Sequence, residues 1–165
     1  MTATQTQAQS GSAIAKVVVP FTNSVRQVFS KMAGVQTTVA TPHLKSHPVS
    51  TYNICGIIGF SGAMTGSVVL SFSEQAAVKL VEAFAGARHE PTSPDFADAI
   101  GELANMVAGC AKQQMGGGIS ISLPSVVIGK GYTIAAGTLP CVVIPCSSPM
   151  GDFSVEVSIK DTPTP

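Results

Sequence analysis

The chain contains 165 residues, with nine basic and nine acidic side chains, so its formal net charge is zero. This length fits one domain or two half-size units that share a core. A neutral chain without a cluster of Lys and Arg lacks the dense positive charge that nucleic-acid binding requires, which argues against DNA and RNA as primary partners. Charged residues make up only 11% of the chain, less than half of the roughly 25% usual in soluble domains, and this favours a homo-oligomer that buries part of the surface.

The two ends of the chain show no pattern of regular structure. Residues 1–12 contain mainly Thr, Gln, Ala and Ser, without the basic start and apolar stretch of a signal peptide, so we expect a disordered N-terminal tail and no export. Residues 161–165 are expected to be frayed. Nowhere does the sequence contain about 18 consecutive apolar residues, the length that a membrane-spanning helix needs. These features predict a cytoplasmic protein that does not insert into membranes.

The first half of the chain reads as a helix, three strands and a second helix. A helix is expected over 17–33, where Phe21, Val25 and Phe29 recur at helical spacing and Gly34 supplies a stop. Strands are expected at 35–41, 52–60 and 67–72, and the last two form a hairpin. The second helix covers 73–86, with Ser73 able to cap its first turn.

The second half repeats this order after a loop over 87–94. A third helix is expected over 95–114 and ends at three consecutive glycines. Strands are expected at 119–123, 125–128, 139–146 and 153–160, with a second hairpin between the last two. Antiparallel hairpins with one apolar face need helices on that face, so we predict an α+β fold of two layers, with a largely antiparallel sheet packed against helices.

Two segments of the sequence are similar to each other. Residues 21–34 align without gaps on residues 96–109, and their apolar positions coincide. Each copy is followed by a strand that ends in a proline and later by a hairpin. We infer a tandem duplication of a helix with three strands inside a single domain over 13–160. The two pseudo-repeats and the helix that joins them cover 17–72, 95–160 and 73–86.

One face of the third predicted helix carries polar and small residues. At about 100° per residue, these residues fall within a stripe about 80° wide. The stripe consists of Asp98, Glu102, Asn105, Gly109 and Lys112. The opposite face is apolar, so the stripe taken alone matches the solvated side of any amphipathic helix.

Two glycines of this helix point to a more specific role. Gly101 and Gly109 each cost roughly 1 kcal/mol relative to alanine inside a helix, and Asn105 is a poor helix former. Small residues beside a carboxylate and a carboxamide would let another macromolecule approach the backbone closely. The first copy carries Gln27 and Ser30 at the positions of the acidic and amide residues. Any chemistry of the stripe therefore belongs to the second copy.

The stripe resembles the signature helix of a known family. Its pattern, Asp98-x3-Glu102-x2-Asn105 followed by Gly109, a strand and Pro124, is similar to that of the CheC/CheX/FliY phosphatases of bacterial chemotaxis, and most similar to CheX. The resemblance extends over about residues 17–160, including the first hairpin. Eighteen residues separate Asn105 from Pro124, a few fewer than in the family pattern, which leaves the role of Pro124 open.

The resemblance implies a function, a partner and roles for the residues. Members of the family hydrolyse the aspartyl phosphate of CheY-type response regulators, with Asn105 here positioning the attacking water and Glu102 engaging a lysine of the regulator. The rest of the stripe, Asp98, Gly109 and Lys112, is expected to contact the partner. Mg²⁺ then belongs to the regulator, and no cofactor is expected in this chain. The resemblance to CheX also implies a homodimer formed through sheet edges and one site per chain.

The chemistry of the pair agrees with this implication on independent grounds. A carboxamide donates and accepts hydrogen bonds but takes no proton at neutral pH, so Asn105 suits the orientation of a water molecule better than general-base catalysis. Phosphoryl transfer asks mainly for positioning and charge stabilisation, since its transition state is loose. A helix-mounted amide that enters a partner's site could therefore complete an unfinished hydrolase.

Two other functions remain open at this point. The same fold could serve as a non-catalytic adaptor or sensor that binds a receiver domain, or as a structural dimer whose polar stripe is solvated. A metal site is not expected, because Pro42 and Pro48 make a helix that would bring His43 and His47 together improbable. Gly-x-Ser-x-Gly and a phosphate-binding loop are both missing from the sequence.

Overall fold

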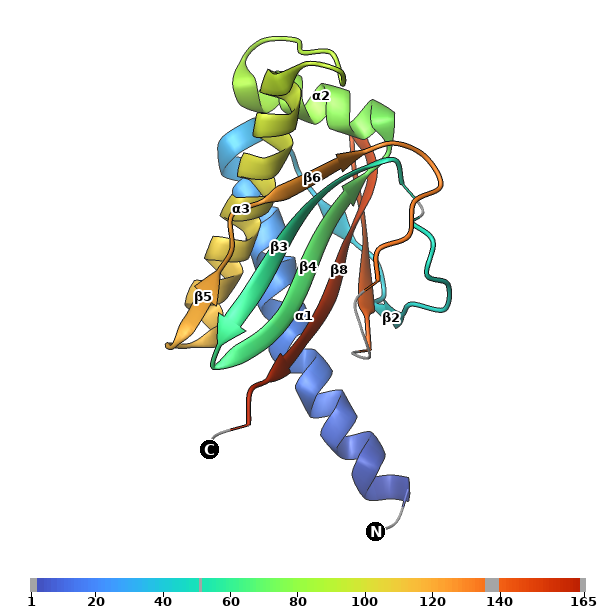
Figure 1. The fold of residues 1–165 in the computed structure, drawn as a ribbon, viewed down its shortest axis with the longest axis vertical. Coiled ribbons are helices and arrows are strands. Elements are labelled where there is room, and N and C mark those ends of the chain that lie inside the picture. The colour runs from blue at the N-terminus through green and yellow to red at the C-terminus, as the bar shows by residue number, and fades with distance from the viewer. Residues whose placement is uncertain (1–2, 51, 136–139, 164–165) are drawn as a thin grey trace.

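The computed structural model describes residues 3–50, 52–135 and 140–163, which form three helices and one eight-stranded antiparallel sheet (Figure 1). This architecture confirms the predicted α+β class. The helices are α1 (Ala3–Ala33), α2 (Glu74–Ala85) and α3 (Pro94–Met115). The strands are β1 (Thr38–Val39), β2 (His43–Leu44), β3 (Ile54–Gly62), β4 (Met64–Phe72), β5 (Ile119–Ile121), β6 (Ser125–Ile128), β7 (Val142–Ser148) and β8 (Gly151–Asp161). Among the described residues, no helix has the length and apolar character needed to cross a membrane.

The first helix is longer than the sequence predicts. Because α1 begins at Ala3, helix replaces the expected disordered tail from residue 3 onward, while residues 1–2 lie outside the described part. The N-terminal turns, drawn in blue, extend past the end of the sheet (Figure 1). Alanine and glutamine are frequent in this segment and have favourable helix propensities. They prolong a helix that the burial of Phe21 and Val25 has already nucleated, and propagation is far less costly than nucleation.

Several strand limits also differ from the prediction. Of the strand expected over 35–41, only β1 is formed, and β2 was not predicted. Both strands have two residues each, too few for an alternating pattern to be recognised in the sequence. Two of the C-terminal residues expected to be frayed are ordered, because Asp161 belongs to β8 and the Thr162 amide donates to the Ala63 carbonyl at 2.9 Å. Residues 164–165 lie outside the described part.

The order of the strands relates the two halves of the chain. The sheet runs β1-β7-β8-β4-β3-β5, with β2 also paired to β7 and β6 also paired to β3. The two long strands β4 and β8 pair at its centre, where Val68 lies opposite Val157. The short strands of each half pair with the hairpin of the other half. A duplicated unit would produce this approximate twofold pattern.

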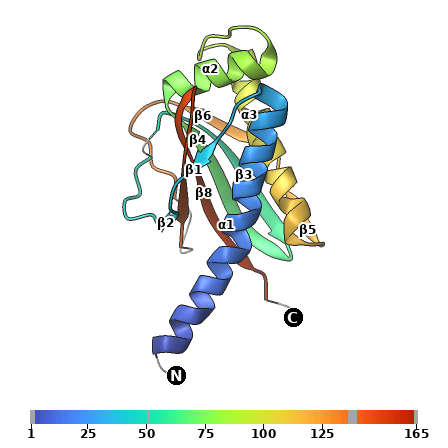
Figure 2. The same ribbon diagram turned by 180° about the vertical axis from the view of Figure 1, so that it is seen from behind.

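The hydrophobic core lies between the helices and one face of the sheet. Helices α1 and α3 pack side by side across this face, and α2 crosses its end (Figure 2). Alternate residues of the central strands point into the core, among them Leu70 and Val155. The ring of Phe29 on α1 packs against Phe72 and Phe153, with ring centroids 6.3 and 4.9 Å away. These contacts attach α1 to the centre of the sheet.

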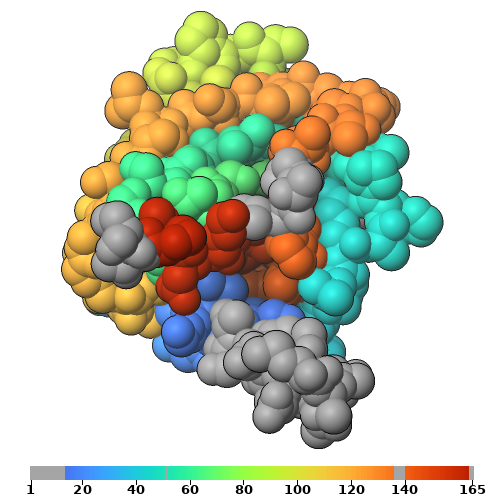
Figure 3. All heavy atoms as spheres, turned by 60° about the horizontal axis from the view of Figure 1, so that its bottom comes forward, coloured from blue at the N-terminus to red at the C-terminus, as the bar shows by residue number. Residues whose placement is uncertain are grey.

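Loops cover much of the opposite face of the sheet. The segment before β3, in cyan, and the segment after β6, in orange, lie together at one side of the molecule (Figure 3). Lys45 reaches the buried Glu156 of β8, with 2.5 Å between Nζ and Oε2. Burial raises the pKa of Tyr132, in the second loop, to about 12. The loops therefore shield part of the sheet face that lies opposite the helices, which explains why polar residues of β8 are buried.

A glycine in β3 sets the distance between α3 and the sheet. A Cβ atom on Gly56 would lie 2.6 Å from the Cβ of Ala104 and 3.3 Å from the carbonyl oxygen of Ile100. Atoms do not approach this closely, so any side chain at Gly56 would push the helix outward. Helix α3, which contains the polar stripe, therefore packs directly against the backbone of β3.

Substitution of Gly56 should separate α3 from the sheet. We expect Gly56→Ala to lower the free energy of unfolding by about 1–3 kcal/mol, the usual cost of overpacking. The matched control is Gly59→Ala in the same strand, where the new Cβ would lie 3.5 Å from Ser122 Oγ, an ordinary contact. Urea denaturation of both variants measures the difference. Equal stability of the two would contradict the close seating of α3.

Candidate active site

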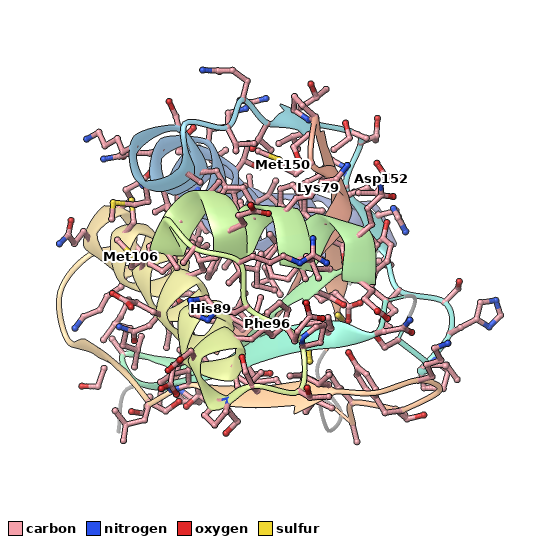
Figure 4. All side chains as sticks on the ribbon, turned by 90° about the horizontal axis from the view of Figure 1, so that it is seen from above. Lys79, His89, Phe96, Met106, Met150 and Asp152 are labelled. Atoms are coloured by element: carbon pink, nitrogen blue, oxygen red, sulfur yellow. The ribbon has the colours of Figure 1, made fainter. Side chains whose placement is uncertain are left out.

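The helix that carries the site is fixed at both ends by its own sequence. The Ser93 hydroxyl caps α3 by accepting a hydrogen bond from the Phe96 amide at 3.2 Å, and Pro94 occupies the first helical position. Phe96 points inward from the first turn and is fully buried (Figure 4). Gly116 ends the helix. The rotation of α3 about its axis is therefore set by a buried apolar face, which leaves the polar stripe outside.

The first groove beside this stripe lies between α3 and the segment that links β5 to β6. We call it the α3–β6 groove, and its volume is about 370 Å³. Asp98, Glu102 and Asn105 are exposed and line it from the helix. Leu123 and Pro124 line it from the other side, with Ala97, Gly101 and Val126 completing the wall. The structure thus brings three of the four polar residues of the predicted stripe to one concave surface.

Gly101 has a role that differs from the prediction. The small residues of the stripe predict an open space above this glycine for an approaching macromolecule, but the chain's own Pro124 occupies it. A Cβ on Gly101 would lie 3.2 Å from the Cγ of Pro124 and 3.4 Å from Val126 Cγ2. This contact also gives Pro124 a role that the sequence left open. Pro124 packs on α3 at Gly101, the residue before Glu102, and forms a wall of the groove. The sequence could not show it, because the two residues are distant in the chain.

A second groove lies on the other side of Asn105, between α1 and α3. This α1–α3 groove has a volume of about 400 Å³, and Asn105 lines it as well as the first groove. Met32 and Met106 contribute apolar surface, and Met106 lies on the side of α3 that faces α1 (Figure 4). Gly109 also lines it, and among the described residues no atom outside its own helical turn lies within 4 Å of the position that a Cβ would take there. Here the predicted open space beside a glycine is present.

Lys112, the last member of the stripe, lies apart from both grooves. Its side chain is half-buried in the last turns of α3 and lines neither the α3–β6 groove nor the α1–α3 groove. The predicted stripe therefore divides into a group of three polar residues at one groove, Gly109 at the other, and Lys112 beyond them.

Glu102 and Asn105 have their polar atoms available. The hydrogen bonds and ion pairs found among the described residues do not involve either side chain. Asp98 is likewise without a cation from the described part of the chain. No group of three or more His, Cys, Asp or Glu residues that could hold a metal ion occurs there either. An amide and a carboxylate one helical turn apart can hydrogen-bond a water molecule and attract a cation of a partner.

The corresponding position on α1 is built differently. Gln27 aligns with Glu102, but its side-chain oxygen accepts a hydrogen bond from Cys110 of α3 at 3.6 Å. Arg26 aligns with Gly101, so the first copy carries a long side chain at the position that admits a proline in the second. Burial raises the pKa of the Cys146 thiol in β7 to about 12, and the positive charge of Arg26 partly offsets this rise. The first copy therefore carries neither the Glu102 and Asn105 pair nor a glycine at the position of Gly101.

Comparisons with known proteins point to one family. The family model described as chemotaxis phosphatase CheX matches residues 54–147. A CheY-P phosphatase CheX of Thermotoga maritima is 30% identical over 151 residues, which cover 88% of this chain and 97% of the relative. The crystal structure of a chemotaxis protein CheX from Desulfovibrio desulfuricans is similar with a TM-score of 0.79 and 31% identity, covering 88% and 99% of the two chains.

A more distant structure shares the fold with this chain. It is a complex of CheX with CheY, BeF3 and Mg²⁺ from Borrelia burgdorferi. The TM-score is 0.73 at 20% identity, and the match covers 88% of this chain and 98% of the other.

The two glycines of α3 give a matched test of the geometry. Alanine inside a helix is favoured over glycine by about 0.5–1 kcal/mol, so Gly109→Ala, which meets no neighbour, should raise the free energy of unfolding by that amount. Gly101→Ala must displace Pro124, and overpacking should outweigh the gain and lower stability by roughly 1 kcal/mol. Denaturant titration of both variants provides the measurement. An equal gain in both would show that Pro124 moves aside without cost, and would contradict a tight contact between Pro124 and α3.

Proposed function

The chain belongs to the CheX family of the CheC-like chemotaxis phosphatases, and from this membership we propose that it hydrolyses the aspartyl phosphate of a CheY-type response regulator. The curated relative from Thermotoga maritima is a CheY-P phosphatase. Glu102 and Asn105 are both exposed on α3 and both line the α3–β6 groove, and this position supports them as the functional residues.

Asn105 positions the attacking water. Its amide oxygen accepts a hydrogen bond from the water and its amide nitrogen donates one, which aligns the water oxygen with the phosphorus atom. The new bond forms between water and phosphorus while the bond between phosphorus and the aspartyl oxygen breaks. Inorganic phosphate and the free carboxylate of the regulator are the products. Because Asn105 lies on the ridge between two grooves, its amide can enter a site on another protein.

Glu102 docks the regulator and fixes the depth of insertion. It lies one helical turn before Asn105, and its carboxylate is available for a lysine of the partner. A charge pair that is desolvated when the two proteins meet is stronger than a pair in water. Asp98, one further turn away in the same groove, extends the negative surface that would attract this lysine.

Gly109 and Lys112 form the outer part of the proposed contact. The space above Gly109 lets the backbone of the regulator approach α3 at the α1–α3 groove. Lys112 lies beyond the grooves and would contact only the margin of the partner. We assign Mg²⁺ to the regulator, in line with the complex of the Borrelia burgdorferi relative. A phosphorylated regulator of this type acts in the cytoplasm, which is where we place the protein.

We also propose a homodimer that forms through sheet edges. β6 pairs with β3 on one side only among the described residues, so its other edge is available for a second chain. Ile128 of this strand is 43% exposed, and Val126 and Val127 are half-buried. An apolar edge strand of this kind favours pairing with another strand. Sedimentation velocity would distinguish a dimer from a monomer.

Removal of the Asn105 amide should abolish turnover while leaving the fold intact. We expect Asn105→Ala to slow the loss of phosphate from a phosphorylated CheY-type regulator by at least about 100-fold, equivalent to about 2.7 kcal/mol of transition-state stabilisation. The control is Gln75→Ala, which removes an exposed carboxamide from α2. Phosphate release under saturating regulator measures both rates. An adaptor of the same fold would bind the regulator without accelerating this release in any variant.

Reversal of the charge at Glu102 should weaken docking. We expect Glu102→Lys to raise the Kd for the regulator at least about tenfold, because an attractive pair becomes a repulsive one, and to lower turnover as well. Glu82→Lys, the same charge change on the exposed surface of α2, serves as the control and should bind normally. Calorimetric titration with the regulator supplies the Kd. Unchanged binding by the Glu102 variant would remove this residue from the interface.

A further inference from the structure

The most exposed large apolar side chain of the described residues stands beside the proposed site. Leu123 lies between β5 and β6 and is 88% exposed, well above Leu44 at 58% and Val19 at 56%. Single exposed apolar residues are common on protein surfaces and need no special explanation. Leu123 is different because it lines the same groove as Glu102 and Asn105.

The backbone on the N-terminal side of Leu123 is held by the sheet. The Ser122 amide donates to the Gly59 carbonyl at 2.9 Å, and the Gly59 amide donates to Ser122 Oγ at 2.9 Å. Ser122 Oγ in turn donates to the carbonyl of Leu123 at 2.8 Å. The hydroxyl thus uses its donor and an acceptor site to connect the turn to β3.

The backbone on the C-terminal side is held by the helix. Pro124 follows Leu123 directly and packs on Gly101 of α3, as shown by the 3.2 Å that a Cβ there would leave to its Cγ. A proline also restricts the backbone of the residue before it to extended conformations. Leu123 is therefore exposed because both of its neighbours are fixed, and not because it lies on a loose loop.

An apolar side chain on a fixed backbone at the border of a binding site is suited to anchor a partner. No backbone entropy has to be lost to place Leu123, so more of its transfer free energy appears as affinity. A regulator that receives Asn105 in its active site must cover the opposite wall of the α3–β6 groove. Leu123 is the apolar group on that wall which extends farthest into solvent.

We propose that Leu123 is an apolar anchor for the docked response regulator. This inference rests on the proposed function and adds a residue that acts on affinity. The partner surface it fits is an apolar patch of the receiver domain next to the phosphorylated aspartate.

The test separates binding from chemistry. The probe is the CheY-type regulator that the native protein dephosphorylates, activated with beryllofluoride for binding and phosphorylated for turnover. Leu123→Ala should raise the Kd about tenfold, the loss expected when a buried leucine is truncated, and Leu123→Asp should raise it further. The rate at saturating regulator should stay within about twofold of the native rate, because Leu123 does not contact the reacting atoms.

A matched control and a fold measurement accompany these variants. Leu44→Ala removes an exposed leucine from β2, which pairs with β7 on the opposite half of the sheet from the groove, and should leave the Kd unchanged. Thermal unfolding of all three variants establishes that they fold, which is expected because the side chain of Leu123 is in water.

Three results would overturn the inference, and they differ from failure of the proposed function. An unchanged Kd for both Leu123 variants, with turnover still dependent on Asn105, would show that Leu123 lies outside the interface. A lower saturated rate with an unchanged Kd would assign it to the chemical step instead. A change in sedimentation with no change in regulator binding would assign it to contact with a second copy of the chain. Failure of the proposed function would give a different result, namely an Asn105→Ala variant that releases phosphate as fast as the native protein.

Discussion

The close contact of α3 with its surroundings at two glycines is the constraint on which the site depends. Gly56 lets Ala104 sit directly on β3, and Gly101 lets Pro124 sit directly on the helix. Both contacts join residues that are distant in the sequence. Both are possible because glycine has no side chain to hold the neighbouring residue away from the backbone. Between them they fix the height and rotation of the turn that carries Glu102. A wider separation at either glycine would preserve the α+β fold and still displace the polar residues from the groove.

The approximate twofold pattern of the sheet does not extend to function. The two halves exchange their short strands and pack α1 against α3, so each half supports the other. At the surface the halves differ, because Arg26 occupies in α1 the position at which α3 has Gly101. The first copy stabilises the domain while the second presents a carboxylate and a free amide. From this difference in side chains we propose a single site per chain, with no change in the underlying architecture.

The sequence predicted what local patterns and repeats can reveal. Periodicity located α3 to within one residue at each end, at Pro94 and Met115, and the stripe placed Glu102 and Asn105 on its exposed side. Contacts between distant residues were beyond its reach. The packing of Pro124 on Gly101 depends on how β5 and β6 cross the helix, and the exposure of Leu123 follows from that packing. β2 was missed because two residues carry no periodic signal. The start of α1 was missed because its first turns lack the apolar residues at helical spacing by which a helix is recognised.

We propose that an amide presented from α3 completes the hydrolysis of a phosphorylated regulator. Phosphate release from a phosphorylated CheY-type regulator, followed with the native protein at about one tenth of the regulator concentration, tests it most directly. We expect several equivalents of phosphate to be released per chain, at a rate proportional to the amount of protein, which only a catalyst can achieve. A rate equal to that of the regulator alone, despite demonstrable binding, would contradict it.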